Sequence, residues 1–246
     1  MQNIRNRFIN NINCNQRLIS FLSKHKKIIL PIFIVISYVL FYFLVDFSSQ
    51  SLVAHDEGLY ARRSRLVEES SNWFLYPFSI PHHKTIGSYW LIASSIRLFG
   101  NSELALRLPS IITSFFCLFI TYLIAYKISN KKAALISVFS LSSMPLWLQY
   151  SRYASPDIPF VLSILLIILF FLKFKESIKY RNKIIYLFIS GLFISIGFFL
   201  RSYMVFVPFL GLIPFIVFNL FNEKNIYRLS FLAGVIFGSL PTLLNL

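Results

Sequence analysis

Two adjacent carboxylates and a nearby phenol are the first candidates for chemistry. Asp56 and Glu57 are followed three positions later by Tyr60. Carboxylates are the residue type most used, beside histidine, for acid–base chemistry. Acidic residues are also common in the first turn of a helix, where they stabilise the positive end of its dipole. The pair therefore has two open interpretations, a reactive site and a simple helix start.

Cations that could hold an anion lie in three further places. Lys84 stands in a turn-rich stretch, Arg152 precedes Asp157 by five positions, and Arg201 comes much later in the chain. A lysine is a compact point charge that can hold a phosphate group. It can equally extend toward lipid headgroups.

The histidines and cysteines do not form a metal-binding pattern. His82 and His83 are adjacent, so they do not face one ligand as a pair spaced by four on a helix would. Cys14 and Cys117 have no Cys or His at metal-ligand spacing. We expect neither a metal ion nor an organic cofactor.

The composition indicates which elements must position these residues. Of 246 residues, 57% are hydrophobic and 13% are charged, with 28 Phe. This excludes an ordinary soluble domain, in which about a quarter of the residues are charged. The net charge of +15 would suit nucleic acid, but the basic residues are dispersed among loops instead of grouped on one face. We expect no nucleic-acid partner.

Apolar runs near the length of a membrane-spanning helix recur along the chain. Helices are expected because lipid offers no partner to unpaired backbone groups. A cleaved signal peptide is the alternative for the first run, which is longer than the apolar core of such peptides. The fold class predicted is all-α, a polytopic transmembrane helical bundle of about seven spans: Ile28–Val45, Leu108–Tyr126, Ala133–Leu148, Ile158–Leu172, Ile184–Leu200, Tyr203–Phe221 and Leu229–Leu246.

Basic residues predict the orientation, because short basic loops stay in the cytoplasm. Sixteen of the 24 Lys and Arg lie in the N-terminal segment and in the loops after the second, fourth and sixth spans. These are predicted to be cytoplasmic, with the N-terminus. The candidate site residues would then share the extracytoplasmic surface: Asp56, Glu57, Tyr60, Lys84, Arg152, Asp157 and Arg201.

A loop of about sixty residues between the first two spans is long enough to indicate a function. Asp56–Ser71 is predicted to be a helix lying at the membrane surface, with Leu59, Tyr60, Leu66 and Val67 on one stripe. A second short helix is expected at about Tyr89–Phe99. The first loop is thus predicted to carry interfacial helices.

The order of several short patterns resembles the N-terminal half of the GT-C superfamily of membrane glycosyltransferases, and within it the group of aminoarabinose transferases and protein mannosyltransferases. The resemblance covers roughly residues 28–220. It rests on Asp56-Glu57-x-x-Tyr60, a lysine-containing turn before Tyr89-Trp90-Leu91, Leu98-Phe99-Gly100, Glu103, Arg107-Leu108-Pro109-Ser110 and Pro156-Asp157.

The resemblance implies transfer of a sugar from a polyprenyl-phosphate donor to an acceptor at the extracytoplasmic face of the plasma (inner) membrane. It implies Asp56 and Glu57 as the catalytic pair and Lys84 as the lysine facing the phosphate, with Arg201 as a second clamp. Tyr60, Arg152 and Asp157 are further candidates. The expected partners are the lipid-linked donor and membrane lipids.

Other classes remain open. Pro208 and Pro214 could break a helix as in transporters, and a non-catalytic membrane subunit or truncated remnant is a further alternative. Residues 1–246 are expected to form a single membrane domain, the N-terminal portion of a longer GT-C fold. The last span ends with the sequence itself, which suggests a fragment.

Overall fold

The computed structural model describes residues 52, 56–74, 85–221 and 223–243, which belong to one compact unit, Asp46–Leu246. All regular structure in these ranges is helical, which confirms the predicted all-α class. In chain order the elements are α2 (Asp56–Glu69), α3 (Gly87–Phe99), α4 (Glu103–Ile128), α5 (Lys131–Ser143), α6 (Pro145–Tyr150), α7 (Asp157–Glu176), α8 (Tyr180–Arg201), the 3₁₀ turn η1 (Ser202–Val205), α9 (Phe206–Phe221) and α10 (Asn225–Leu243).

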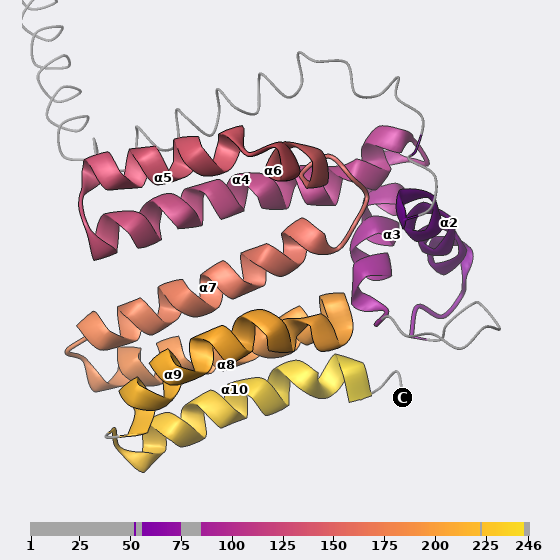
Figure 1. The fold of residues 1–246 in the computed structure, drawn as a ribbon. Coiled ribbons are helices and arrows are strands. Elements are labelled where there is room, and N and C mark those ends of the chain that lie inside the picture. Colours follow the sequence, from indigo (N-terminus) through magenta and orange to yellow (C-terminus); the bar gives the residue numbers. More distant parts are fainter. Residues whose placement is uncertain (1–51, 53–55, 75–84, 222, 244–246) are drawn as a thin grey trace, which may run out of the picture. The chain divides into compact units, whose positions relative to one another are not determined.

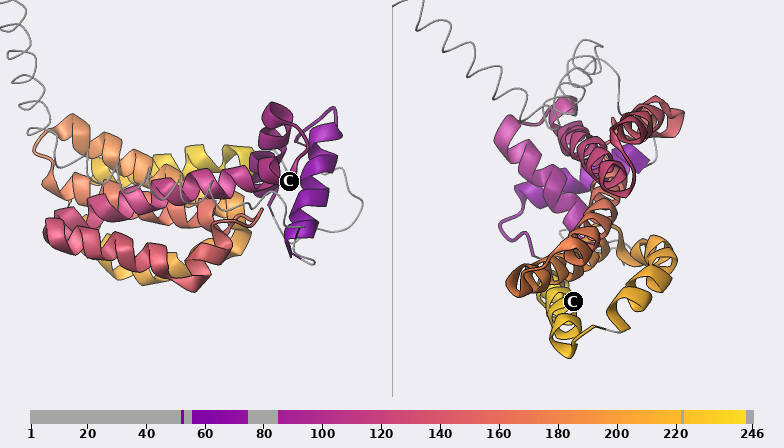
Figure 2. Two further views of the ribbon diagram at one scale, coloured as in Figure 1. Left: turned by 90° about the horizontal axis from the view of Figure 1, so that it is seen from above. Right: turned by 90° about the vertical axis from the view of Figure 1, so that its left-hand side faces the viewer.

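The long helices of this unit lie side by side. Helix α4 packs against α5 and α7, α7 against α8, and α8 against α10. Helices α2 and α3 pack on each other at one end of these long helices, and α3 also contacts α4 and α8 (Figures 1 and 2). The candidate site residues are therefore sought at this end.

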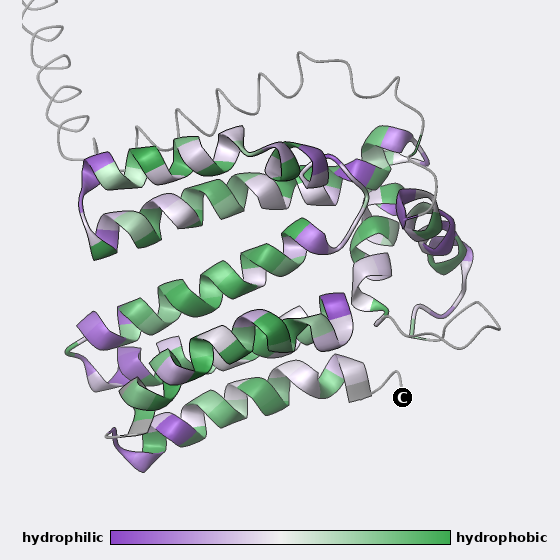
Figure 3. Ribbon diagram, in the orientation of Figure 1, coloured by the Kyte–Doolittle hydropathy of each residue, from purple (hydrophilic) through white to green (hydrophobic). Residues whose placement is uncertain are grey.

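Three stretches are long and apolar enough to cross a membrane, namely Glu103–Ile128, Asp157–Glu176 and Tyr180–Phe218. Figure 3 shows hydrophobic residues along the length of the long helices and hydrophilic residues gathered at their ends. Three predicted spans, Leu108–Tyr126, Ile158–Leu172 and Ile184–Leu200, lie within α4, α7 and α8. The first predicted span, Ile28–Val45, lies outside the described residues, and the count of seven stays a prediction.

The predicted span Ala133–Leu148 is wrong as one continuous helix. It is divided into α5 and the short α6, with Met144 between them in an extended conformation (φ −67°, ψ 128°). The cause is Pro145, because a proline disfavours helical geometry in the residue that precedes it. The same proline is well placed as the first residue of α6.

Helices α8 and α10 approach closely because a glycine of each helix faces the backbone of the other. A side chain on Gly191 would overlap the Phe231 carbonyl, and one on Gly234 would overlap the Phe188 carbonyl. Hydroxyl groups add bonds between the two backbones: Ser195 donates to the Val235 carbonyl at 2.6 Å and Ser230 donates to the Ile184 carbonyl at 2.7 Å. This is the small-residue packing common in membrane helices.

Candidate active site at one end of the helical bundle

The directions of the long helices bring distant segments together. Helices α4 and α7 run in the same direction, and α8 runs back along α7 (Figure 1). The starts of α4 and α7 and the last turn of α8 therefore lie at one end, beside α2 and α3. Each of these helix ends supplies a charged side chain: Arg107, Asp157 and Arg201.

Three hydrogen bonds with described residues hold Glu57 at this end. The Arg107 guanidinium donates to both carboxylate oxygens, from Nε at 2.8 Å and from Nη2 at 3.1 Å. The backbone N–H of Ala154 donates to the Glu57 Oε1 at 3.1 Å. The Glu57 side chain is fully buried and that of Arg107 is 5% exposed. One carboxylate thus joins α2, α4 and the segment before α7.

The buried face of α2 explains this geometry. Its buried residues are Glu57, Tyr60, Ala61, Ser64 and Val67, at helical spacings of three and four. The predicted helix Asp56–Ser71 is confirmed apart from its last two residues, but the buried stripe differs from the expected one, because Leu59 and Leu66 are only half-buried. Glu57 points into the protein, whereas Asp56, one residue earlier, is exposed.

Asp157 and Arg201 form an ion pair, with 2.6 Å between Oδ1 and Nη1. The aspartate begins α7 and the arginine ends α8. Each charge is opposite to the partial charge of its own helix terminus, so both placements are favourable. The two side chains keep 25% and 29% of their surface exposed. An anion from outside can therefore reach the guanidinium.

Tyr60 links α2 to this pair. Its ring packs on that of Tyr89, with 5.6 Å between the ring centroids. Burial raises the pKa of the Tyr60 hydroxyl, an effect that Arg201 opposes and that Tyr89, Asp157 and Asp56 reinforce. The charges of Arg201, Asp157 and Asp56 are thus close enough to act on one phenol, which stays protonated at neutral pH.

Tyr89 is also buried, which raises the pKa of its hydroxyl. Arg63 donates to this hydroxyl from Nη1 at 3.1 Å and opposes the shift. The arginine of one helix is thus bonded to the phenol of the other, which fixes α2 against α3.

The start of α3 is fixed to the end of α8. The Thr85 N–H donates to the Ser202 hydroxyl at 2.9 Å, and the Thr85 hydroxyl donates to the Phe198 carbonyl at 3.2 Å. Gly87 lies so close to Phe199 that a side chain would overlap its ring. Ser202 has a positive φ of 54°, an uncommon conformation for a residue other than glycine.

The structure brings five of the seven predicted site residues together: Asp56, Glu57, Tyr60, Asp157 and Arg201. Arg152 lies two residues before Ala154 and is half-buried, while Lys84 lies outside the described residues. The sequence does not indicate Arg107 as the partner of Glu57, although this arginine belongs to the pattern Arg107-Leu108-Pro109-Ser110. In the described ranges, no group of three His, Cys, Asp or Glu side chains lies close enough together to hold a metal ion.

The fold resembles that of solved membrane proteins. The crystal structure of ArnT from Cupriavidus metallidurans in the apo state matches 87% of this chain and 41% of that chain, with a TM-score of 0.71 and 16% identity. The structure of the same protein bound to undecaprenyl phosphate matches 90% of this chain and 41% of that chain, with a TM-score of 0.69 and 15% identity. The class defined by the fold is a polytopic helical protein, and the chain is an integral membrane protein.

The chain belongs to the dolichyl-phosphate-mannose-protein mannosyltransferase family, whose model matches residues 83–243. It is 30% identical over 184 residues to the undecaprenyl phosphate-alpha-4-amino-4-deoxy-L-arabinose arabinosyl transferase of Wigglesworthia glossinidia brevipalpis, covering 72% of this chain and 32% of that protein. A protein of Aquifex aeolicus is 32% identical over 114 residues, 45% of this chain and 23% of its own length. The chain thus spans about a third or less of these relatives.

Proposed function

We propose that this chain carries the reaction site of an enzyme that transfers a glycosyl group from a polyprenyl-phosphate-linked sugar to a lipid, glycan or protein acceptor. The observation that carries the proposal is the convergence of Asp56, Tyr60, Asp157 and Arg201 at one end of the bundle. Membership of a mannosyltransferase family supports the reaction type. The names of the relatives favour undecaprenyl phosphate as the carrier and 4-amino-4-deoxy-arabinose as the first sugar to test.

Asp56 is the proposed catalytic carboxylate. It is the exposed member of the acidic pair at the start of α2, so an acceptor can approach it. For a hydroxyl acceptor, Asp56 takes the proton as the oxygen attacks the anomeric carbon, a role worth about 10²- to 10⁴-fold in rate. For an acceptor phosphate, which is already ionised, Asp56 would only orient the group.

Glu57 is proposed to position Asp56 without touching the reactants. All three of its described bonds go to protein groups in the interior. Because Asp56 is the next residue on the same helix, fixing Glu57 fixes the start of α2. This assigns the two carboxylates of the predicted catalytic pair to different tasks.

Arg201 and Lys84 are proposed to hold the phosphate of the donor. The lipid phosphate of the donor is the leaving group of the transfer, so cations placed where its negative charge develops lower the barrier. Asp157 contacts Arg201 through Nη1, and a guanidinium has five N–H donors in all. Asp157 can therefore orient the arginine while other donors bind the phosphate. Lys84 directly precedes Thr85 in the sequence, and Thr85 is bonded to Ser202, the neighbour of Arg201.

The site is proposed to face the extracytoplasmic side of the plasma membrane, with the N-terminus in the cytoplasm. The support is the distribution of basic residues. Lysines gather at the end of the bundle remote from the site, where Lys127 pairs with Glu176 and Lys183 pairs with Glu223 at 3.6 Å.

The test is transfer of radiolabelled sugar in proteoliposomes that contain the complete gene product and a polyprenyl-phosphate donor. We expect Asp56→Asn to lower the rate about 10²-fold or more with unchanged thermal stability. Glu69→Gln, an exposed acid at the other end of α2, is the matched control. Unchanged transfer in Asp56→Asn would contradict the assigned role. Absence of transfer with every donor would favour a non-catalytic membrane subunit.

A further inference from the structure

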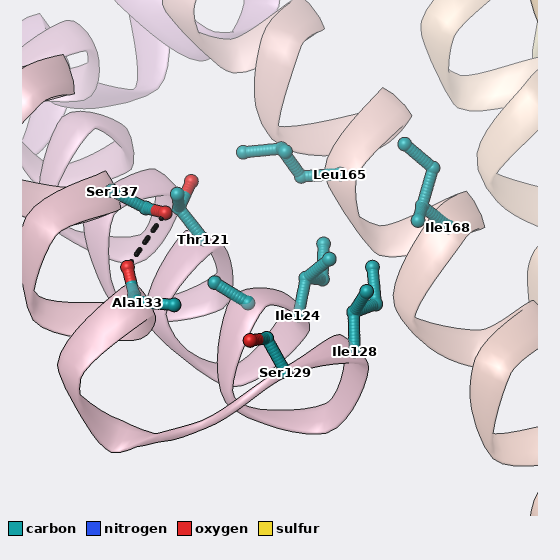
Figure 4. Close-up of a pocket in the computed structure, with 9 residues that line it drawn as sticks. Thr121, Ile124, Ile128, Ser129, Ala133, Ser137, Leu165 and Ile168 are labelled. Atoms are coloured by element: carbon teal, nitrogen blue, oxygen red, sulfur yellow. Dashed lines mark hydrogen bonds between the residues drawn. The ribbon is translucent and has the colours of Figure 1, made fainter.

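An apolar groove lies at the end of the bundle opposite to the candidate active site. Its volume is about 380 Å³, and it is formed by the end of α4, the start of α5 and the middle of α7 (Figure 4). The residues on its walls are Thr121, Ile124, Ala125, Ile128, Ser129, Ala133, Ser137, Leu165 and Ile168. Thr121 to Ser129 is about 12 Å of helix, so the groove follows the last turns of α4.

Hydroxyl groups interrupt the apolar wall. The Ser137 hydroxyl donates to the Ala133 carbonyl at 2.9 Å. The Thr121 Oγ1 is buried, so a ligand in the groove does not reach it. Ser129 lies on the wall where α4 ends and is exposed, so its hydroxyl is the one that a ligand can meet.

Two lysines stand beside the groove at its polar end. Lys131 and Lys132 directly precede Ala133 and are exposed. Three other lysines at this end of the bundle are engaged within the protein: Lys127 with Glu176, Lys183 with Glu223, and Lys173 against the Phe170 ring at 5.4 Å. Among the described residues, no ion pair or ring contact involves Lys131 or Lys132. Their charge is thus available to an external anion.

We propose that this groove binds one anionic phospholipid. An acyl chain fills the apolar wall between Ile124 and Leu165, the glycerol ester region meets the Ser129 hydroxyl, and the phosphate contacts Lys131 and Lys132. The start of α5 adds the positive end of its helix dipole on the same side. The order of apolar, hydroxyl and cationic groups matches the order of groups in a phospholipid. The proposal does not depend on the proposed transfer reaction.

The test is native mass spectrometry of the purified full-length protein titrated with phosphatidylglycerol or phosphatidylcholine. We expect tighter binding of one phosphatidylglycerol than of phosphatidylcholine. Removing both charges in Lys131→Ala/Lys132→Ala should weaken that binding about 10- to 30-fold, since each basic residue near a membrane surface contributes about fivefold in affinity. The matched control is Lys179→Ala/Arg181→Ala, a pair of exposed cations on either side of Tyr180, the first residue of α8.

A second variant separates the groove from the charges. Ala125→Phe fills the groove without changing any lysine and should also weaken phosphatidylglycerol binding, provided that its thermal stability is that of the wild type. Equal binding of the two lipids, or equal losses in the lysine pair and the control pair, would overturn the proposal. So would displacement of phosphatidylglycerol by an equimolar amount of undecaprenyl phosphate, which would indicate a site for the donor lipid.

Discussion

Arg107 and Glu57 form a two-point ion pair in the interior, 50 positions apart in the sequence. The arginine belongs to a helix that is apolar enough to span a membrane, and the glutamate belongs to α2. A charge buried without its partner is far more costly than a buried pair. The pair therefore makes the position of α2 on α4 specific.

Removing one member of this pair should destabilise the protein strongly. We expect Glu57→Leu to lower the free energy of unfolding by about 3–5 kcal/mol, because Arg107 then stays buried without its partner. The double variant Glu57→Leu/Arg107→Leu should recover much of this loss. Chemical unfolding of the purified protein in detergent measures both. Additive losses in the double variant would show that the two side chains do not depend on each other.

The same variants test the positioning role. Glu57→Leu/Arg107→Leu should regain stability but not the rate of sugar transfer, because the start of α2 loses the contact with the Ala154 N–H. Arg107→Lys keeps the charge but cannot donate to both oxygens in the same way, so we expect an intermediate kcat. Full activity in the stable double variant would contradict the positioning role of Glu57.

Loss of Arg201 should impair transfer more than loss of another exposed arginine. We expect Arg201→Gln to lower kcat/KM for the lipid-phosphate donor about 10²-fold, as for other groups that stabilise a developing negative charge. Arg62→Gln is the control, because Arg62 is exposed on α2. Steady-state kinetics in proteoliposomes provide the comparison, and similar effects of the two substitutions would remove Arg201 from the site.

The buried phenols should make the fold sensitive to alkali. Burial raises the pKa of Tyr60 and Tyr89 above the ordinary value of 10.0. The folded state then binds a proton more tightly than the unfolded state, so this stability is complete below about pH 10 and is lost as the pH rises further. Tyr60→Phe should make the fall of Tm above about pH 10 less steep. An unchanged slope would contradict the assignment.

The glycines between α8 and α10 allow a matched pair of substitutions. Gly234→Ala should destabilise the protein, because the added methyl group would overlap the Phe188 carbonyl. Gly211→Ala, on α9, meets nothing within 4 Å and should stabilise its helix by about 0.5–1 kcal/mol. Thermal unfolding of the two variants in the same detergent should give Tm changes of opposite sign.

The pattern of the sequence predicts some parts of this structure well. Apolar runs mark α4, α7 and α8 because a helix in lipid must be apolar over its length. The acids at the start of α2 and the meeting of Asp157 with Arg201 at one end follow from the topology. The first two features depend on local composition. The third depends on the alternation of the predicted spans between the two ends of the bundle.

Other parts depend on contacts that the pattern does not contain. Nothing near Glu57 in the sequence indicates that its partner is Arg107, because the pair is set by the packing of α2 on α3, which in turn packs on α4. Pro145 indicates a break within Ala133–Leu148, but the apolar residues on both sides of this proline favour one continuous span. The bonds from Thr85 to Ser202 and Phe198 join residues more than a hundred positions apart.

The bonds of Glu57 also impose an order on biosynthesis. The carboxylate meets Arg107 only after 50 further residues have been made, and the Ala154 N–H only after 97. At about 5–20 residues per second, translation of the longer interval takes several seconds. During this time α2 cannot reach its final place, since its buried face carries a charge that still needs water. Helix α2 therefore docks late, after the segments that receive Glu57 have been made.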